Sequence, residues 1–318
     1  MSQSSQPGWQ YAVYGIETLV VGIGLGSWML AYLSTHPLRW PVFRPRDLKD
    51  VLEDVQFSSR DGLRLSGWFL PANDARGGIV LCHGAFSHRS EMLFWARIFH
   101  RRGYHVLLFD FRARGRSEGQ RCSLGYYEVQ DLEGAIDYLL TRPEMAGLPA
   151  GVMGLSMGGA VALMTAAKDE RIAAVATHGA YAQLNRAIAQ HGRLFLGPLG
   201  PLFAVPTAWW GMQWLPIKPE KVSPREAIAR IAPRPVLIMH GARDRIVRRE
   251  DAELLYQAAG APKEKLILPR SWHFRIYPSE QPGYAEILGA FFEKHLHPSR
   301  RCAGFQLPSS RLHGLSSI

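Results

Sequence analysis

Short apolar runs alternate with amphipathic helical patterns from residue 52 onward, and this alternation limits the possible folds more than any other feature. Runs of this length suit strands buried on both faces of a parallel sheet. Helices between successive strands then cover both faces, so we expect a doubly wound, mostly parallel α/β sheet. The turn Arg60-Asp61-Gly62 predicts a leading antiparallel hairpin at one edge. The expected strands are 55–58, 63–70, 78–82, 105–109, 152–155, 172–177, 236–239 and 266–268, and the expected helices are 91–102, 127–141, 157–168, 250–259 and 281–296.

The amino-terminal segment contains an apolar stretch from Tyr11 to Leu33 whose only charged residue is Glu17. A helix needs about 20 apolar residues to cross the hydrocarbon core of a bilayer. We therefore expect residues 1–35 to form a hydrophobic membrane anchor. Basic residues follow the stretch and none precedes it, so the positive-inside rule predicts that the rest of the chain is cytoplasmic. A cleaved signal peptide and a core helix of the folded domain are the alternatives.

The composition excludes several classes of protein. The chain has 318 residues, 47% of them hydrophobic, which is enough to bury a large core. Its three cysteines, Cys82, Cys122 and Cys302, are too widely spaced for a disulfide framework or a zinc site. The net charge of +10 is not gathered in a basic run, so we expect no nucleic-acid partner. We also expect no metal, because no His/Asp cluster has metal-ligand spacing. We expect no cofactor, and the glycine-rich residues 22–26 lack the preceding strand of a dinucleotide site.

The segment from Gly154 to Gly159 reads GLSMGG, follows an expected strand and opens an expected helix. A serine in this setting lies on a tight strand-to-helix turn that exposes its hydroxyl. The glycines two positions before and after Ser156 leave room for that turn. The free N–H groups at the start of the helix favour negative charge beside the serine. The motif therefore predicts a nucleophile at Ser156.

Five motifs occur in a characteristic order: LCHG (81–84), DFRARGRS (110–117), GLSMGG (154–159), HGARDRIV (240–247) and SWHF (271–274). Together they resemble the α/β-hydrolase superfamily over roughly residues 50–296. The similarity is greatest to serine hydrolases with a serine-aminopeptidase-like domain behind an amino-terminal membrane segment. The resemblance implies the α/β-hydrolase fold and a catalytic Ser-His-Asp triad.

The acid and the base of this triad are expected after two late strands. Asp244 follows the strand 236–239, His273 follows the strand 266–268, and the chain order Ser, Asp, His matches the superfamily. Asp110 and Asp131 are rival acids, although the arginine-rich loop after Asp110 favours a structural role there. The resemblance also implies an oxyanion hole, formed by the backbone N–H groups at the positions of Ala85 and Met157. His83, just before that loop, is expected to brace it rather than to act as a base.

Residues 181–224 interrupt the alternation with an apolar, aromatic segment punctuated by proline and glycine. Such an insertion predicts a helical lid or a binding wall, with ordinary packing helices as the alternative. We expect Phe86, Trp209, Trp210 and Trp214 to line the substrate pocket. The expected organisation is an anchor over 1–35, an α/β-hydrolase domain over 36–297 and a flexible tail over 298–318.

The combined features predict a membrane-anchored serine hydrolase. It would cleave carboxylic esters of small apolar or lipid-like molecules through an acyl-enzyme intermediate. A serine peptidase and a thioesterase or acyltransferase use the same triad and are the alternatives. A non-catalytic binding protein on this fold fits less well, because all three triad positions are filled.

Overall fold

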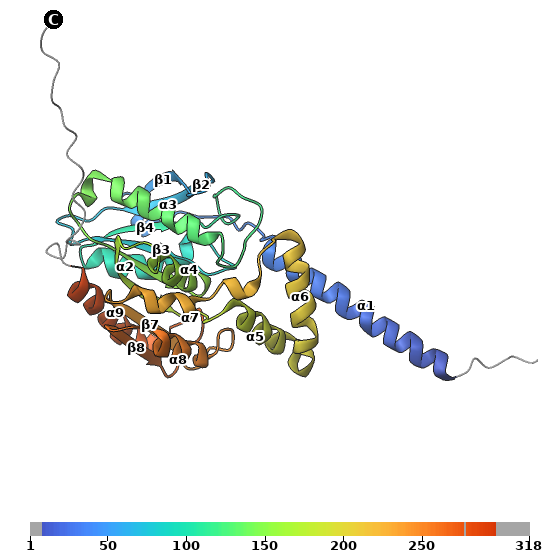
Figure 1. Ribbon diagram of the computed structural model, residues 1–318. Helices are drawn as coiled ribbons and strands as arrows, with labels where there is room; N and C mark the ends of the chain where they lie inside the picture. The colour runs from blue at the N-terminus through green and yellow to red at the C-terminus, as the bar shows by residue number, and fades with distance from the viewer. Residues whose placement is uncertain (1–7, 277, 297–318) are drawn as a thin grey trace, which may run out of the picture.

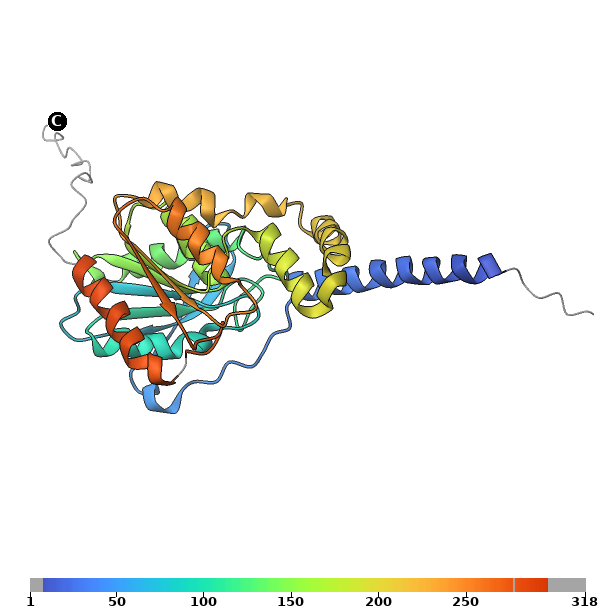
Figure 2. The same ribbon diagram turned by 90° about the horizontal axis from the view of Figure 1, so that it is seen from below.

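The computed structural model describes residues 8–276 and 278–296, in which eight strands form one sheet of order β1-β2-β4-β3-β5-β6-β7-β8 (Figures 1 and 2). The pairs β1–β2 and β2–β4 are antiparallel, and all other neighbours are parallel. The predicted doubly wound, mostly parallel sheet is therefore confirmed, with the hairpin at one edge. The strands are β1 (Glu53–Ser58), β2 (Arg64–Leu70), β3 (Gly78–Cys82), β4 (His105–Phe109), β5 (Ala150–Leu155), β6 (Ile172–His178), β7 (Val236–Gly241) and β8 (Lys263–Leu268).

Helices cover both faces of this sheet. One apolar cluster joins α2 and α9 to one face, and a second joins α3, α4 and α8 to the other. The expected helix 91–102 is divided into a 3₁₀ turn, Arg89–Met92, and the helix α2. The helices are α1 (Gly8–Thr35), α2 (Leu93–Arg101), α3 (Glu128–Thr141), α4 (Met157–Ala166), α5 (Leu184–Leu196), α6 (Gly200–Trp214), α7 (Pro224–Ala227), α8 (Arg249–Ala258) and α9 (Gln281–His295).

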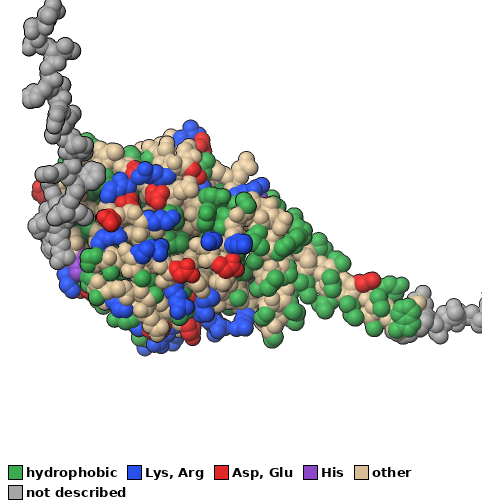
Figure 3. Space-filling view, viewed as in Figure 1, with side chains coloured by type: hydrophobic (Ala, Val, Ile, Leu, Met, Phe, Trp, Pro, Cys, Tyr) green, Lys and Arg blue, Asp and Glu red, His purple; other side chains and the backbone are tan. Residues whose placement is uncertain are grey.

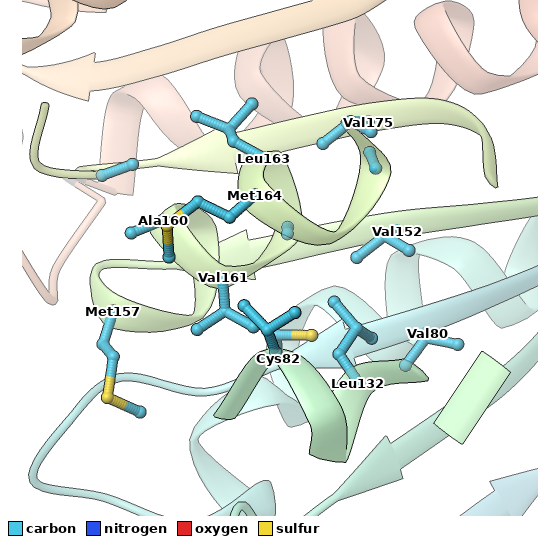
Figure 4. Close-up of a cluster of buried hydrophobic side chains, with 14 of the residues drawn as sticks. Val80, Cys82, Leu132, Val152, Met157, Ala160, Val161, Leu163, Met164 and Val175 are labelled. Atoms are coloured by element: carbon cyan, nitrogen blue, oxygen red, sulfur yellow. The ribbon is translucent and has the colours of Figure 1, made fainter. Parts of the chain in front are cut away.

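Helix α4 is buried along its whole length in the apolar cluster on one face of the sheet, where it also contacts α3 (Figure 4). Its side chains are apolar apart from one threonine, and Val161 and Leu163 are fully excluded from solvent. A helix that is apolar all round is stable only inside a core. The burial of α4 fixes the position of its amino terminus, where Ser156 lies.

Helix α1 projects from the folded part of the chain, and hydrophobic side chains gather over it and over the neighbouring insertion (Figure 3). The most apolar 18-residue window of the segment Trp9–Thr35 has a mean hydropathy of 1.5, and 11% of that window is buried. Such exposure is not that of a core helix. By length and composition α1 is able to cross a membrane, a property that signal sequences share.

The insertion 181–224 contains α5 and α6, and the last turns of α1 pack on α6. The Ser27 hydroxyl donates to the carbonyl of Phe203, and a Cβ on Gly26 would lie 2.9 Å from the Phe203 ring. The carbonyl of Thr35 accepts the N–H of Cys122 at 2.8 Å, which joins the end of α1 to the folded domain. The predicted tail over 298–318 lies outside the described residues.

Candidate active site

Ser156 lies on a sharp turn between β5 and α4, with φ 54° and ψ −119°. L-residues rarely adopt this conformation, and such strain persists only where the surroundings impose it. Two glycines make the turn possible. A Cβ on Gly154 would lie 2.3 Å from the carbonyl oxygen of Gly158, and one on Gly158 would lie 2.2 Å from that of Cys82. The amino terminus of α4 therefore approaches the end of β3 closely.

Ser156, His273 and Asp244 form a continuous hydrogen-bonded chain. The His273 Nε2 atom lies 2.8 Å from the Ser156 Oγ atom, and its Nδ1 atom lies 2.5 Å from the Asp244 Oδ2 atom. The other carboxylate oxygen of Asp244 accepts the N–H groups of Ile246 and Val247, both at 2.9 Å. The side chains of Ser156, His273 and Asp244 are all buried. The carboxylate favours a proton on Nδ1, which leaves Nε2 to accept the serine proton.

The rival acids Asp110 and Asp131 are used elsewhere. Asp110 accepts the backbone N–H groups of Arg89 and Arg116 and pairs with the Arg89 guanidinium at 3.3 Å. Asp131 pairs with the guanidinium of Arg112 at 2.7 Å. Both carboxylates are fully buried and hold the arginine-rich loop after β4.

The loop after β3 brings Ala85 to the same cavity as Ser156 and Met157. His83 braces this loop: its Nε2 accepts the N–H of Phe111 at 3.0 Å, and its Nδ1 lies 2.7 Å from the carbonyl oxygen of Gly84. Burial lowers the pKa of His83 to about 3. The ring is therefore neutral near pH 7, as its acceptor role at Nε2 requires.

Glu91 is a site residue that the sequence reasoning missed. Its carboxylate accepts the N–H of Gly84 at 2.8 Å, one residue before Ala85. Burial raises the pKa of Glu91, while the Gly84 hydrogen bond and the charge of His273 act in the opposite direction. No motif separates this glutamate from an ordinary surface residue, because only the tertiary structure brings it under the loop.

A cavity of about 480 Å³ opens above Ser156 and His273. This volume lies within the range of about 300–1,000 Å³ that is usual for small-molecule sites. Burial lowers the pKa of His191, one of the few polar residues in its wall, to about 4. Among the described lining residues none is Asp, Glu, Lys or Arg. Most of the wall comes from α1, the loop after β3, α5, α6 and the loops that carry Asp244 and His273. The lining residues are Leu30, Leu33, Ser34, Ala85, Phe86, Leu124, Ser156, Met157, Tyr181, Leu184, Ala187, Ile188, His191, Gly192, Leu196, Phe203, Ala204, Thr207, Ile246, Val247, His273 and Phe274.

The expected pocket residues divide into two groups. Phe86 lines the cavity, whereas Trp209, Trp210 and Trp214 are not among its lining residues, so that part of the prediction is wrong. The reason is the orientation of α6, which presents Phe203, Ala204 and Thr207 to the cavity. Trp214 instead packs against α1, with ring centroids 6.2 Å from Trp28 and 5.8 Å from Tyr32.

No group of three or more His, Cys, Asp or Glu side chains in the described part of the chain is placed to hold a metal ion. The chemistry available at this site is that of a buried hydroxyl, an imidazole and a carboxylate at the end of a parallel sheet. Open α/β sheets usually carry their sites at this edge.

Comparison with known proteins finds a matching family and several relatives. Residues 73–228 match the Hydrolase_4 family, described as serine aminopeptidase, S33. The chain is 28% identical to the uncharacterized protein YfhR of Escherichia coli (strain K12) over 259 residues, which is 77% of this chain and 82% of YfhR. It is 27% identical to the uncharacterized protein YqkD of Bacillus subtilis (strain 168), over 89% of this chain and 96% of YqkD.

The fold is also found among solved structures. The Pyrococcus furiosus esterase PF2001 superposes with a TM-score of 0.70 at 24% identity, over 83% of this chain and 98% of the esterase. Dienelactone hydrolase from Anabaena variabilis superposes with a TM-score of 0.55 at 22% identity, over 78% of this chain and 100% of the dienelactone hydrolase. Together with the mostly parallel sheet, these likenesses show the α/β-hydrolase fold, and the family match supports an enzyme of the α/β-hydrolase superfamily.

Proposed function

We propose that this α/β hydrolase cleaves carboxylic esters with apolar acyl groups through an acyl-enzyme intermediate on Ser156. The observation that carries the proposal is the hydrogen-bonded chain from Ser156 through His273 to Asp244. The Ser156 end of this chain faces an apolar cavity. His273 takes the hydroxyl proton as the Ser156 Oγ atom attacks the ester carbonyl, and Asp244 stabilises the resulting imidazolium. The N–H groups of Ala85 and Met157 stabilise the oxyanion.

The second half of the reaction uses the same groups. His273 returns its proton to the leaving alcohol as the tetrahedral intermediate collapses. A water molecule, deprotonated by His273, then attacks the acyl-enzyme. As this second tetrahedral intermediate collapses, the bond between Ser156 Oγ and the acyl carbon breaks, His273 returns the proton to Ser156 Oγ, and the carboxylic acid leaves.

The lining of the cavity favours an apolar acyl ester over a peptide with a free amino terminus. An aminopeptidase needs an anionic group to hold the ammonium of its substrate, and the described lining residues include no carboxylate side chain. A thioesterase or acyltransferase differs from an esterase only in the leaving group or in the acceptor. A panel of ester, thioester and amide substrates separates these activities.

We also propose that α1 is a retained membrane anchor, with the catalytic domain in the cytoplasm. Leu30, Leu33 and Ser34 belong to the cavity wall, so cleavage of α1 as a signal peptide would open the substrate site. The basic residues after α1 support the cytoplasmic orientation.

The proposed function is tested by the kinetics of p-nitrophenyl esters from acetate to dodecanoate. We expect kcat/KM to rise with chain length, because each added methylene is worth about 0.8 kcal/mol when it is buried. Ser156→Ala is expected to lower kcat by at least about 10⁴-fold in a folded protein. A preference for acetate contradicts the apolar acyl site, and near-normal turnover by Ser156→Ala contradicts the mechanism.

A further inference from the structure

The two ends of the anchor helix lie in different environments. From Trp9 to Leu25 its apolar side chains are mostly exposed, whereas its last turns pack on α6 and line the active-site cavity. A helix that served only as a tether needs no contact with the substrate site. The participation of Leu30, Leu33 and Ser34 in the cavity wall is therefore a second property of α1, distinct from anchoring.

The position of these residues along α1 places the cavity at the membrane surface. Leu30 lies about 32 Å beyond Trp9 along the helix axis, at about 1.5 Å per residue. The hydrocarbon core of a bilayer is about 30 Å thick. If Trp9 lies at the far interface, Leu30 and Leu33 lie at the near one, level with the headgroups.

The orientation of α1 on the domain is fixed by contacts other than the cavity. Arg39, which follows the helix, donates to the carbonyl oxygens of Gly115, Ser117 and Gly119 at 3.2, 2.5 and 2.6 Å. The close approach of Gly26 to the Phe203 ring fixes α6 against α1. The part of the cavity wall that α1 and α6 form is therefore fixed relative to α1, and so relative to a membrane that α1 spans.

Helix α6 and the turn before it present apolar side chains on the outside as well. Leu202 is 51% exposed and Val205 is 75% exposed, and hydrophobic side chains continue from this region onto α1 (Figure 3). A soluble protein gains nothing from such exposure, but a bilayer surface would cover these residues as it covers α1. The hydrocarbon of the bilayer is thus the occupant that this outer face fits.

We propose that α1 and α6 together form the acyl-binding entrance of the enzyme, and that the substrate is a bilayer lipid ester whose acyl chain reaches Ser156 from the membrane between the two helices. The proposal rests on the proposed function and adds the source and class of its substrate. The uncharged lining accepts the acyl chain, and the ester bond at headgroup level meets the Ser156 hydroxyl.

The direct test uses the full-length chain in vesicles of phosphatidylcholine and phosphatidylglycerol. The probe is an alkyl fluorophosphonate of about twelve carbons with a diazirine at the chain end. The Ser156 Oγ atom forms a bond to phosphorus, fluoride leaves, and the hydroxyl proton passes to His273. Irradiation then links the chain end to its neighbours, which mass spectrometry of the digest identifies.

We expect links in the α1 peptide that ends at Arg39 and in the α6 segment around Phe203. If Ser156 is labelled but the chain end links to other parts of the protein and not to α1, the proposed entrance is overturned and the proposed function stays intact. No label on Ser156 refutes the proposed function itself.

A pair of α1 variants tests the same entrance by kinetics and separates a bilayer substrate from a soluble one. Leu30→Trp fills the cavity wall, and Leu25→Trp alters a side chain that is 64% exposed. For Leu30→Trp we expect the ratio of kcat/KM for dodecanoyl monoglyceride in vesicles to that for p-nitrophenyl acetate to fall about tenfold. Leu25→Trp keeps the wild-type ratio. An unchanged ratio in Leu30→Trp contradicts the proposal. The proposal is also contradicted if Leu30→Trp lowers kcat/KM equally for a water-soluble dodecanoyl ester and the wild type shows no preference for the vesicle substrate.

Discussion

Glu91 lies under the proposed oxyanion loop, and its carboxylate accepts the Gly84 N–H at 2.8 Å. Glu91→Ala removes this acceptor and frees the loop that carries Ala85. We expect kcat for p-nitrophenyl acetate to fall by up to about 10²-fold, since small misplacements of catalytic groups have effects of that size. Glu91→Gln retains an acceptor oxygen and is expected to keep kcat near that of the wild type. Equal losses in both variants, at equal thermal stability, contradict a positioning role for this hydrogen bond.

At this scale the sequence predicted the residues that belong to local motifs. Ser156 is marked by its flanking glycines, and Asp244 and His273 by their positions after strands, and the structure brings the three side chains together. Their catalytic roles stay predictions. Glu91 and the tryptophans of α6 were beyond prediction, because the contacts of a surface-type glutamate and the direction of a helix face depend on tertiary packing.

The position of α4 depends on the absence of a side chain at Gly158. A Cβ on Gly158 would lie 2.2 Å from the backbone oxygen of Cys82, and neither backbone segment has room to move in the core. We expect Gly158→Ala to lower both the melting temperature and kcat, because α4 must shift away from β3 and carry Ser156 with it. The measurements are a thermal melt and the turnover of p-nitrophenyl acetate.

Gly211→Ala on α6 is the matched control, because a Cβ there meets nothing within 4 Å. Alanine is favoured over glycine in a helix by roughly 0.5–1 kcal/mol, so this variant is expected to be as stable as the wild type or slightly more stable. A Gly158→Ala protein with unchanged melting temperature and turnover refutes the close-approach argument.

The strands and helices of the sheet were predictable because buried parallel strands leave short apolar runs in the sequence. β3 and β4 have the predicted bounds, and most other elements differ at their ends by one to three residues. The packing of α1 on α6 was not predictable. Both helices read as apolar segments, and nothing in their patterns shows that each covers the other.

For the molecule as a whole, the proposed anchor predicts how the protein partitions. We expect the full chain to remain in the membrane pellet after alkaline carbonate extraction, because the exposed apolar part of α1 is stable only in hydrocarbon. Residues 1–7 and α1 should be present in the mature protein by intact mass. Release of the full chain into the soluble fraction, or a mature protein that begins after α1, contradicts the anchor.

The location of a fluorophosphonate label on the full chain decides whether Ser156 is the nucleophile. We expect one label, on Ser156, at a rate that falls by orders of magnitude in His273→Ala because the serine loses its base. Ser156→Ala is expected to take up no label at the site. Labelling of Ser156→Ala at the wild-type rate, or of a different serine in the wild type, would contradict the claim that Ser156 and His273 form the reactive pair.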